Sequence, residues 1–255
     1  MIARDAGVVT LTLNRPQRRN AIDVPLWHAL ARALSEIAAR AEDRAVVLTG
    51  AGGSFCAGGD LSGSRDGGAE RAADPLAAAV NAVRDSVNAA CLALHRLPQP
   101  VVAAVEGTAA GAGANLAFGC DLVIAAASAR FGEVFVRRAL PLDSGGSWLL
   151  PRLVGLQKAK ELAFFGDWIA ADEAERIGLV NRVVADGRAL TAAQDVAMRL
   201  AEAPPTALAW IKRNLNASFA KSFEQALDAE ARGLAECVAT PEFGAALRAF
   251  FDRQR

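Results

Sequence analysis

Apolar and polar positions alternate in two different ways over the first two hundred residues, and each way predicts a type of element. Residues 7–16, "GVVTLTLNRP", alternate in polarity and end at a proline, which is typical of a strand followed by a turn. Two continuous apolar runs, "RAVVLTG" (44–50) and "PVVAAVEG" (100–107), predict buried strands. The segments "CDLVIAAASARFG" (120–132) and "LVNRVV" (179–184) predict further strands.

Other stretches repeat their apolar residues at the spacing of a helix. Residues 25–40 place Leu26, Leu30, Leu34 and Ile37 on one face, and residues 74–97 continue such a pattern after Asp74, a suitable N-cap. A glycine turn in 108–121 leads into another helix. Three short helices are predicted at 144–155, 156–166 and 171–178. The polar, glycine-rich residues 62–73 predict a surface loop.

The pattern changes after the pair Pro204-Pro205. Residues 206–218, 223–240 and 241–255 all have amphipathic helical periodicity, and no strand pattern occurs among them. Alternation of strands and helices followed by helices alone predicts an α/β core over residues 1–200 and a helical region over residues 201–255. The apolar residues of that region are expected to cover the core or a partner subunit.

Composition limits the classes of function. Lys and Arg number 28, as do Asp and Glu, so the formal net charge is zero, which argues against broad binding to nucleic acid or an anionic membrane. Nothing resembles a signal peptide or an apolar span of about 18 residues. The four scattered cysteines suggest reduced thiols and a cytoplasmic location. The two histidines, His28 and His95, lie in predicted helices, so a histidine-based triad or metal site is not expected.

Two glycine-rich turns each follow a buried strand, "GAGGSFCAGGD" (50–60) and "TAAGAGAN" (108–115). The first begins as a dinucleotide fingerprint but has Phe55 where that fingerprint needs glycine. Each turn carries an alanine flanked by glycine, Ala57 and Ala112, whose N–H groups no bulky neighbour would block. Two convergent N–H groups would stabilise a developing oxyanion, although close packing alone also explains the glycines.

These segments together resemble the crotonase, or enoyl-CoA hydratase/isomerase, superfamily. The resemblance rests on "GAGGSFCAGGDL", "PVVAAVEGTAAGAGANLAFGCDLVIAAASARFG", "LTLNRPQRRNAI" and "ADEAERIGLVNRVV" and covers nearly the whole chain. It implies a core of repeated ββα units and a C-terminal helical region that forms a homotrimer or a dimer of trimers. It also implies an acyl-CoA thioester as substrate, with coenzyme A as part of the substrate and no further cofactor or metal.

The resemblance assigns roles to particular residues. The thioester oxygen would lie between the N–H groups of Ala57 and Ala112. Coenzyme A would contact the segment of Ala57, Gly58, Gly59, Asp60 and Leu61 and the loop with Arg18 and Arg19. The two arginines would meet phosphates, or they are simply solvated charges. Gly111 belongs to the second glycine turn at the same site.

Acid–base chemistry distinguishes the members of the superfamily. Similar hydratases use two glutamates, but the matching positions here are Asn115 and Phe135, neither of which transfers a proton. Asp143, eight residues beyond Phe135, matches the single aspartate of isomerase-like members, such as those similar to epoxyphenylacetyl-CoA isomerase. The resemblance therefore favours an acyl-CoA isomerase with Asp143 as acid and base. Glu133 is a weaker candidate.

Other interpretations stay open from the sequence. Asp143 precedes "SGGSW" and an apolar helix, so it could be only an N-cap, whose hydrogen bonds would make it a weaker base. Useful basicity needs an apolar surrounding, which Phe135 and Trp148 could supply unless they are ordinary core residues. An enoyl-CoA hydratase with an unusual acid–base pair, and a non-catalytic acyl-CoA-binding protein, are the alternatives.

Overall fold

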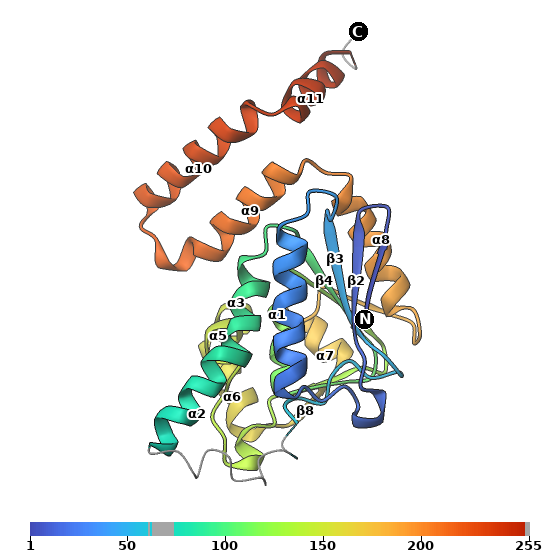
Figure 1. Cartoon of the computed structure of the whole chain (residues 1–255), viewed down its shortest axis with the longest axis vertical. Coiled ribbons are helices and arrows are strands. Elements are labelled where there is room, and N and C mark those ends of the chain that lie inside the picture. Colours follow the sequence, from blue (N-terminus) through green and yellow to red (C-terminus); the bar gives the residue numbers. More distant parts are fainter. Residues whose placement is uncertain (61, 63–73, 253–255) are drawn as a thin grey trace.

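A computed structural model describes residues 1–60, 62 and 74–252 of the chain (Figure 1). The strands are β1 (Ile2–Asp5), β2 (Val8–Leu13), β3 (Ala45–Gly50), β4 (Val101–Val105), β5 (Thr108–Ala110), β6 (Leu122–Ala126), β7 (Arg130–Gly132), β8 (Trp168–Ala170) and β9 (Arg182–Val184). The helices are α1 (Val24–Ala38), α2 (Pro75–Val83), α3 (Ala89–Arg96), α4 (Ala112–Phe118), α5 (Gly146–Val154), α6 (Leu156–Phe165), α7 (Ala171–Arg176), α8 (Ala189–Ala201), α9 (Pro205–Ala217), α10 (Phe223–Val238) and α11 (Pro241–Asp252). Shorter turns of helix are η1 (Pro16–Arg18), η4 (Arg84–Asn88), η5 (Val136–Arg138) and η6 (Ser218–Ala220).

The main sheet has the strand order β1-β2-β3-β4-β6-β9. The pair β1 and β2 is antiparallel, and every other neighbouring pair in this sheet is parallel. Its middle is formed by β3 and β4, the two continuous apolar runs, and all residues of β4 are buried. Central parallel strands are covered on both faces, which is why these two lack polar alternation. The predicted α/β core is confirmed.

Helices cover the main sheet (Figure 1). Helix α8 packs on β3 and β4 and presents Ala189, Ala193 and Ala197, all fully buried. Residues four apart lie on one face of a helix, and alanine lets the helix axis approach the strands closely. Helix α1 packs beside α3 and adds Leu34 and Ile37 to the same core.

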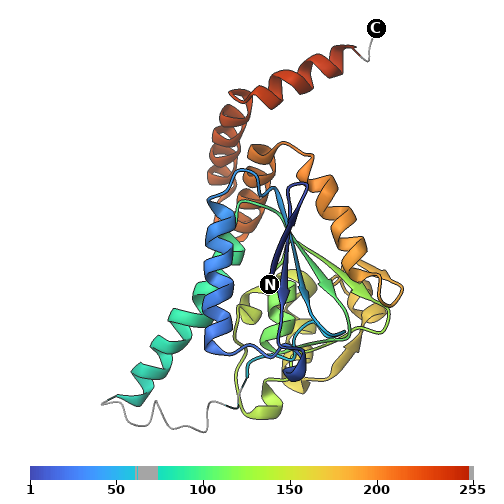
Figure 2. The ribbon, with the colours of Figure 1, turned by 45° about the vertical axis from the view of Figure 1, so that its right-hand side comes forward.

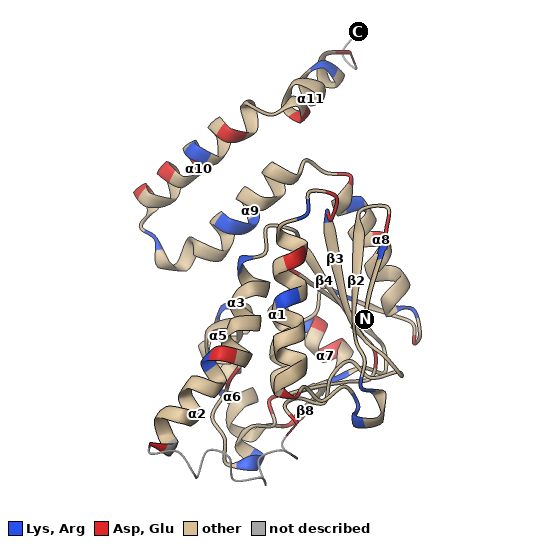
Figure 3. Cartoon of the chain, in the orientation of Figure 1, with Lys and Arg blue, Asp and Glu red and all other residues tan. Residues whose placement is uncertain are grey.

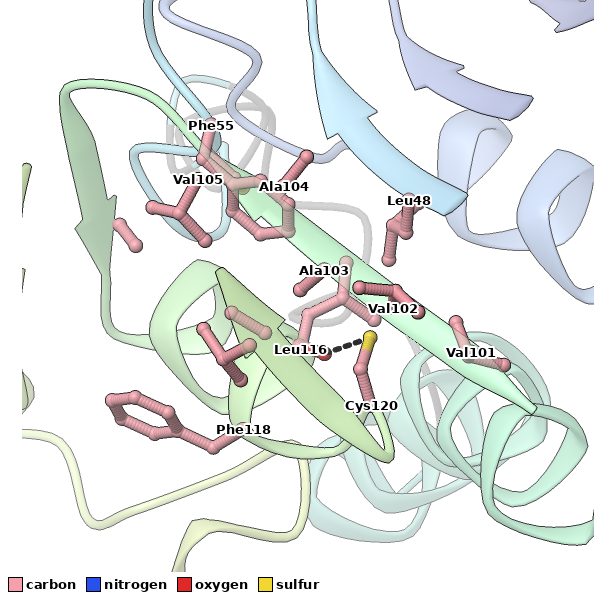
Figure 4. Close-up of a cluster of buried hydrophobic side chains, with 14 of the residues drawn as sticks. Leu48, Phe55, Val101, Val102, Ala103, Ala104, Val105, Leu116, Phe118 and Cys120 are labelled. Carbon is pink, nitrogen blue, oxygen red and sulfur yellow. Dashed lines mark hydrogen bonds between the residues drawn. The ribbon is translucent and has the colours of Figure 1, made fainter. Parts of the chain in front are cut away.

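Figure 4 shows how the core surrounds β4. Side chains of β4 meet Leu48 of β3 and Phe55, the residue that broke the dinucleotide fingerprint. Phe55 has no exposed surface and is one of the largest fully buried side chains. On the α4 side, Leu116 packs into the same cluster, and the thiol of Cys120 donates to its carbonyl oxygen at 3.4 Å. This core fixes the ends of β3 and β4, from which both glycine-rich turns emerge.

A second sheet has the order β5-β7-β8, with β5 and β7 parallel and β7 and β8 antiparallel. Each of its strands is three residues long. Strands this short leave little periodicity in a sequence. For this reason β5, inside the predicted glycine turn at 108–121, and β7, inside the predicted strand and turn at 120–132, were not predicted as separate strands. Likewise, β1 and β8 have no clear pattern of apolar and polar residues and were not predicted from the sequence.

The predicted helix over 74–97 consists of α2 and α3 joined by η4, one π-helical turn. The prediction of continuous helix is therefore confirmed, with a local change in hydrogen bonding that periodicity does not reveal. Of the predicted loop 62–73, only Ser62 is described, and Leu61 also lies outside the described residues.

The helices α9, α10 and α11 follow β9 in the predicted helical region. Figures 1 and 2 both show α10 and α11 extending away from the sheet toward the C-terminus. Several large apolar side chains on these helices are more than half exposed, among them Leu215, Phe223, Leu234, Phe250 and Phe251. The prediction of a boundary near residue 200 is compatible with this arrangement and stays a prediction.

Candidate active site

The first glycine turn is folded around the side chain of Asn20, which has no exposed surface. Its amide accepts the N–H of Arg15 at 2.9 Å and donates to the carbonyl oxygens of Ala51 at 2.8 Å and Ser54 at 2.7 Å. Gly50 has no room for a side chain, because a Cβ there would lie 2.2 Å from the Ser54 carbonyl oxygen. Sequence reasoning missed Asn20, although an asparagine shortly after Arg15-Pro16 is a recognisable turn signal. In the structure its φ is 57°, in the left-handed region that asparagine tolerates.

Arg15 joins the two loops of this region through its guanidinium. It contacts Asp60 at 2.9 Å and Asp23, the N-cap of α1, at 3.2 Å. Hydrogen bonds from Ser62, together with Arg15, lower the pKa of Asp60 to about 2. The carboxylate of Asp60 is thus occupied by its neighbours, which makes it a structural anion at the cavity edge and a poor base.

Two isolated parallel bridges tie the segment 56–60 in place, Ile22 to Gly59 and Cys56 to Ala109. In the first, the N–H of Ile22 donates to Gly58 at 2.8 Å and the N–H of Asp60 donates to Ile22 at 2.9 Å. A parallel bridge uses the groups flanking its partner residue, so the N–H of Gly59 points away from Ile22. Within the described residues, that N–H has no hydrogen-bond acceptor.

This geometry corrects one prediction. The N–H of Ala57, expected to face the thioester oxygen, already donates to the carbonyl oxygen of Arg19 at 2.9 Å. Ala57 lines the cavity, but the free donor of this turn is two residues further on, at Gly59. A Cβ at Gly59 would meet nothing within 4 Å, so the backbone of this residue is open to a ligand.

The second glycine turn presents the N–H of Ala112, the first residue of α4. No described residue accepts a hydrogen bond from it. Gly111, with a φ of 52°, makes the turn into α4, and Gly113 lies against Cys56 so closely that a Cβ would be 2.4 Å from the Cys56 carbonyl oxygen. The two turns therefore touch each other and bring two unpaired N–H groups to one cavity.

That cavity has a volume of about 340 Å³. It is lined by Arg18, Ala21, Ala57, Gly58, Gly59, Asp60, Ala110, Gly111, Ala112, Val134, Phe135, Arg138, Leu140 and Asp143. Most of the predicted site residues are on this list. The structure adds Ala21, Ala110, Val134, Arg138 and Leu140, which were not among the predicted site residues. Arg19 contributes its carbonyl oxygen to the fold of the turn and does not line the cavity.

Asp143 lies between η5 and α5 and lines this cavity. The N-cap of α5 is Gly145, and no side chain caps the helix, so the capping interpretation of Asp143 is wrong. The carboxylate accepts a hydrogen bond from the Ser144 hydroxyl at 2.8 Å. Asp143 is exposed at the cavity mouth, but enough protein surrounds its carboxyl group that lost hydration raises its pKa. The exposure of Asp143 and its raised pKa both suit a base.

The backbone of Asp143 is fixed from two sides. Its carbonyl oxygen accepts the N–H of Gly146 at 2.9 Å and the side-chain amide of Asn115 at 3.0 Å. The same amide nitrogen of Asn115 lies 3.4 Å from a carboxyl oxygen of Glu133. Glu133 is buried behind Asp143 and does not line the cavity. Burial, with a smaller effect of the Asp143 charge, raises the pKa of Glu133 to about 8.

A second cavity, of about 390 Å³, lies beside the first. It is lined by Asn88, Cys91, Leu92, Leu94, His95, Asn115, Leu116, Gly119, Ser144, Gly145, Trp148 and Leu149. Trp148, expected beside Asp143, is here instead, packed edge-to-face on His95 with 5.2 Å between ring centroids. Asn115 and Ser144 connect this largely apolar cavity to Asp143.

A larger hollow, of about 780 Å³, lies where α3 meets α9 and contains neither free N–H group nor Asp143. Size alone therefore does not identify the site. Figure 3 shows cationic and anionic residues interspersed along the ribbon, in agreement with the zero net charge. At the first cavity, Arg18 and Arg138 supply local positive charge. No helix in the described part of the chain has the length and apolar character needed to cross a membrane.

Comparison with known proteins agrees with the geometry. The enoyl-CoA hydratase/isomerase family model matches residues 3–255. The chain is 40% identical over 229 residues to the 1,2-epoxyphenylacetyl-CoA isomerase of Escherichia coli, spanning 89% of this chain and 85% of that protein. It is 39% identical over 251 residues to a probable enoyl-CoA hydratase of Rhodobacter capsulatus, spanning 97% and 93%.

Solved structures give the same result. The crystal structure of a putative enoyl-CoA hydratase from Streptomyces coelicolor superposes with a TM-score of 0.93 at 35% identity, covering 99% of this chain and 91% of that one. A putative enoyl-CoA hydratase/isomerase from Mycobacterium abscessus gives a TM-score of 0.91 at 34% identity, covering 99% and 97%. The predicted fold, an α/β crotonase-like core with a C-terminal helical region, is confirmed.

Proposed function

The chain belongs to the enoyl-CoA hydratase/isomerase family, and from the geometry of its site we propose that it is an acyl-CoA isomerase. One observation carries the choice. Of the two acids that line the cavity with the free N–H groups, Asp60 is held by Arg15 and Ser62, which leaves Asp143 as the available acid–base group. The finer assignment, isomerase over hydratase, rests on this single carboxylate.

The proposed chemistry is a 1,3 shift of a double bond in an enoyl thioester. The thioester oxygen accepts the N–H groups of Gly59 and Ala112, which stabilise the negative charge that develops on it. The Asp143 carboxylate takes a proton from one carbon of the acyl chain, and the resulting dienolate is conjugated with the carbonyl. The carboxyl group then returns that proton two carbons away. No net proton or water is consumed, so one acid–base group is sufficient.

Each free N–H group has a definite energetic role in this scheme. Loss of one oxyanion donor costs about 3 kcal/mol of barrier in well-characterised acyl-transfer sites. Because the donors are backbone groups held by parallel bridges and by α4, they need no rearrangement when the charge develops. The same preorganisation predicts tight binding of thioester analogues that carry a negative oxygen.

In this proposal, each of the two cavities binds a different part of the substrate. Arg18 and Arg138, at the first cavity, suit the phosphates of coenzyme A, and the largely apolar second cavity suits the acyl group. Asp143 lines the first cavity and its neighbour Ser144 lines the second, so the base lies where the thioester meets the acyl chain. This placement is what a base acting on carbons near the carbonyl requires.

Enoyl-CoA hydratase is the second candidate, favoured by the hydratase names of several relatives. Hydration also needs a group that manages a proton on the attacking water, and two acids would serve. Glu133 is near Asp143, but it is buried and does not line the cavity. The alternative would therefore need a movement that brings Glu133 to the substrate.

The exposed apolar residues of α9, α10 and α11 support a further proposal, a homotrimer or a dimer of trimers. Phe223 and Leu234 on α10 and Phe250 on α11 are each more than half exposed. Apolar faces of this kind mark surfaces of association. Sedimentation equilibrium at several protein concentrations measures the assembled mass directly.

An acyl-CoA panel with product analysis tests the enzymatic proposal. We expect shifted or rearranged isomers of unchanged mass, without the mass of added water. Asp143→Asn should lower kcat by at least about a thousandfold while thioester binding, measured by calorimetry, persists. Asp228→Asn, an exposed acid on α10 paired with Arg232, is the control and should keep full activity. Unchanged turnover in the Asp143→Asn variant would refute the assignment of the base.

A further inference from the structure

Glu133 is a buried acid that the proposed reaction does not use. It follows β7 directly, and only 3% of its surface is exposed. Within the described residues it forms no ion pair, and its one side-chain hydrogen bond comes from the neutral amide of Asn115. Its other carboxyl oxygen, Oε1, has no hydrogen-bond partner there. Buried charges are normally paired, so this arrangement calls for a physical reason.

Asn115 is held rigidly between Glu133 and the start of α5. A Cβ at Gly146 would lie 2.4 Å from the Asn115 amide nitrogen, so the backbone of α5 packs directly on the amide. The amide nitrogen reaches Glu133 Oε2 at 3.4 Å and the Asp143 carbonyl oxygen at 3.0 Å. Glu133, Asn115 and Asp143 thus form one connected cluster in which the amide has no room to rotate.

The hydrogen-bond inventory of this cluster shows which form of Glu133 fits. Both hydrogens of the Asn115 amide are committed, to Glu133 and to Asp143. Two acceptors, Glu133 Oε1 and Asn115 Oδ1, are left without a donor among the described residues. A carboxylate can only accept, whereas a neutral carboxyl group also donates one O–H. Protonation of Glu133 therefore adds one O–H donor to a cluster that holds these two unpaired acceptors.

The charged groups around Glu133 favour the same form. Asp143 is the group whose charge opposes ionisation of Glu133. The nearby cations are engaged elsewhere: Arg137 pairs with Asp167, and Arg130 stacks on the Trp168 ring at 4.6 Å. Arg138 lines the first cavity, where Glu133 is absent. Among the residues that the structure describes, no cation pairs with the buried carboxyl group of Glu133.

We propose that Glu133 is a positioning residue, kept in its neutral form, that holds the Asn115 amide and through it the backbone of Asp143. This inference rests on the proposed function in one respect, the role of Asp143 as the base. As a neutral acid, Glu133 adds no further negative charge beside Asp143. A second negative charge there would oppose the dienolate, which is itself an anion.

Two variants separate the neutral acid from a carboxylate. Glu133→Gln keeps the shape of a neutral carboxyl group, so kcat at pH 7 should stay within about threefold of the parent. Glu133→Leu removes the partner of Asn115 and should lower kcat about tenfold or more with little change in KM, because the N–H groups of Gly59 and Ala112 do not depend on it. Glu173→Gln, a partly exposed acid on α7 that pairs with Arg176, is the matched control and should change neither parameter.

The pH profile is a readout that a purely structural role would not move. The parent enzyme should lose activity on an alkaline limb with an apparent pKa near the value of about 8 for Glu133, and Glu133→Gln should lack that limb. Identical profiles in the two proteins would overturn the proposal, as would full activity of Glu133→Leu.

A spectroscopic test is independent of turnover. Infrared spectroscopy of the protein at pH 7 should show the C=O band of a buried neutral carboxylic acid, and this band should vanish in Glu133→Gln and persist in Glu173→Gln. Absence of the band in the parent protein would refute the neutral form whatever the substrate is. Unchanged turnover of Asp143→Asn beside a clear band would instead refute the proposed function and its base.

Discussion

Substitution of Gly113 by alanine tests whether contact between the two glycine turns positions the catalytic N–H groups. A Cβ at Gly113 would lie 2.4 Å from the carbonyl oxygen of Cys56 and 2.7 Å from its Cβ and Sγ atoms. Cys56 cannot move away easily, because its N–H donates to Thr108 at 3.0 Å and its carbonyl oxygen accepts from Ala110 at 2.9 Å. The clash is therefore with backbone that is hydrogen-bonded on both sides.

The expected loss of rate and stability in Gly113→Ala can be estimated from the 2.4 Å distance between the added Cβ and the Cys56 carbonyl oxygen. An ordinary contact begins at 3.4 Å, so α4 and the first turn must separate by about 1 Å, the difference between 3.4 and 2.4 Å. A misplacement of about 1 Å at a reacting centre can cost about a hundredfold in rate. Overpacking of a dense core costs about 1–3 kcal/mol, and a chain of this size loses about 2–4 °C in Tm for each kcal/mol.

We expect Gly113→Ala to fold with a lowered Tm and to lose about a hundredfold in kcat/KM, with weaker binding of a thioester analogue in calorimetry. The matched control is Gly244→Ala on α11, away from the cavity, where a Cβ would lie 3.6 Å from Arg248 Nη1, an ordinary contact, and φ is ordinary. That control should keep the parent Tm and an activity within a few-fold. Parent-like activity and Tm in Gly113→Ala would refute the reasoning, and so would equal damage in both variants.

Three further predictions concern buried polar groups and pH. Asn20→Ala leaves the carbonyl oxygens of Ala51 and Ser54 without a donor, and each unpaired group costs about 1–3 kcal/mol, so the free energy of unfolding should fall by several kcal/mol. Urea denaturation measures this loss against the exposed control Asn81→Ala, and a loss below about 1 kcal/mol would contradict the role given to Asn20. Glu133→Gln should be more stable than the parent at alkaline pH, because folding raises the pKa of Glu133 from 4.5 to about 8 and the folded parent therefore binds the proton more tightly than the unfolded chain. The stability of the parent should fall relative to the variant as pH rises from 4.5 to about 8, by at most about 5 kcal/mol, and a pH-independent difference would exclude the shift. Because burial raises the pKa of Asp143, enzymatic activity should fall on acidification with an apparent pKa above 3.8. Initial rates measured from pH 4 to 7 that show no acidic loss of activity would argue against Asp143 as the base.

Elements with a long, local pattern of apolar and polar residues could be predicted from the residues alone. The apolar runs of β3 and β4 identified the centre of the sheet, and the helical periodicity after Pro204 identified α9, α10 and α11. Glycine-flanked Ala112 and the acid Asp143 could also be selected from the sequence, because each depends on its own neighbours or on a family motif. Three-residue strands such as β5 and β8 were beyond this reasoning, since a pattern of three positions carries little information.

Which groups are free to act depends on contacts between residues that are far apart in the chain. Whether the first turn offers the N–H of Ala57 or of Gly59 depends on Arg19 and Ile22, which lie almost forty residues earlier in the chain and form hydrogen bonds with that turn. The same holds for Trp148, which packs on His95 in a second cavity, and for Glu133, which Asn115 links to Asp143. Hydrogen bonds and burial between distant residues set donor availability and pKa, and no local pattern of residue types encodes them.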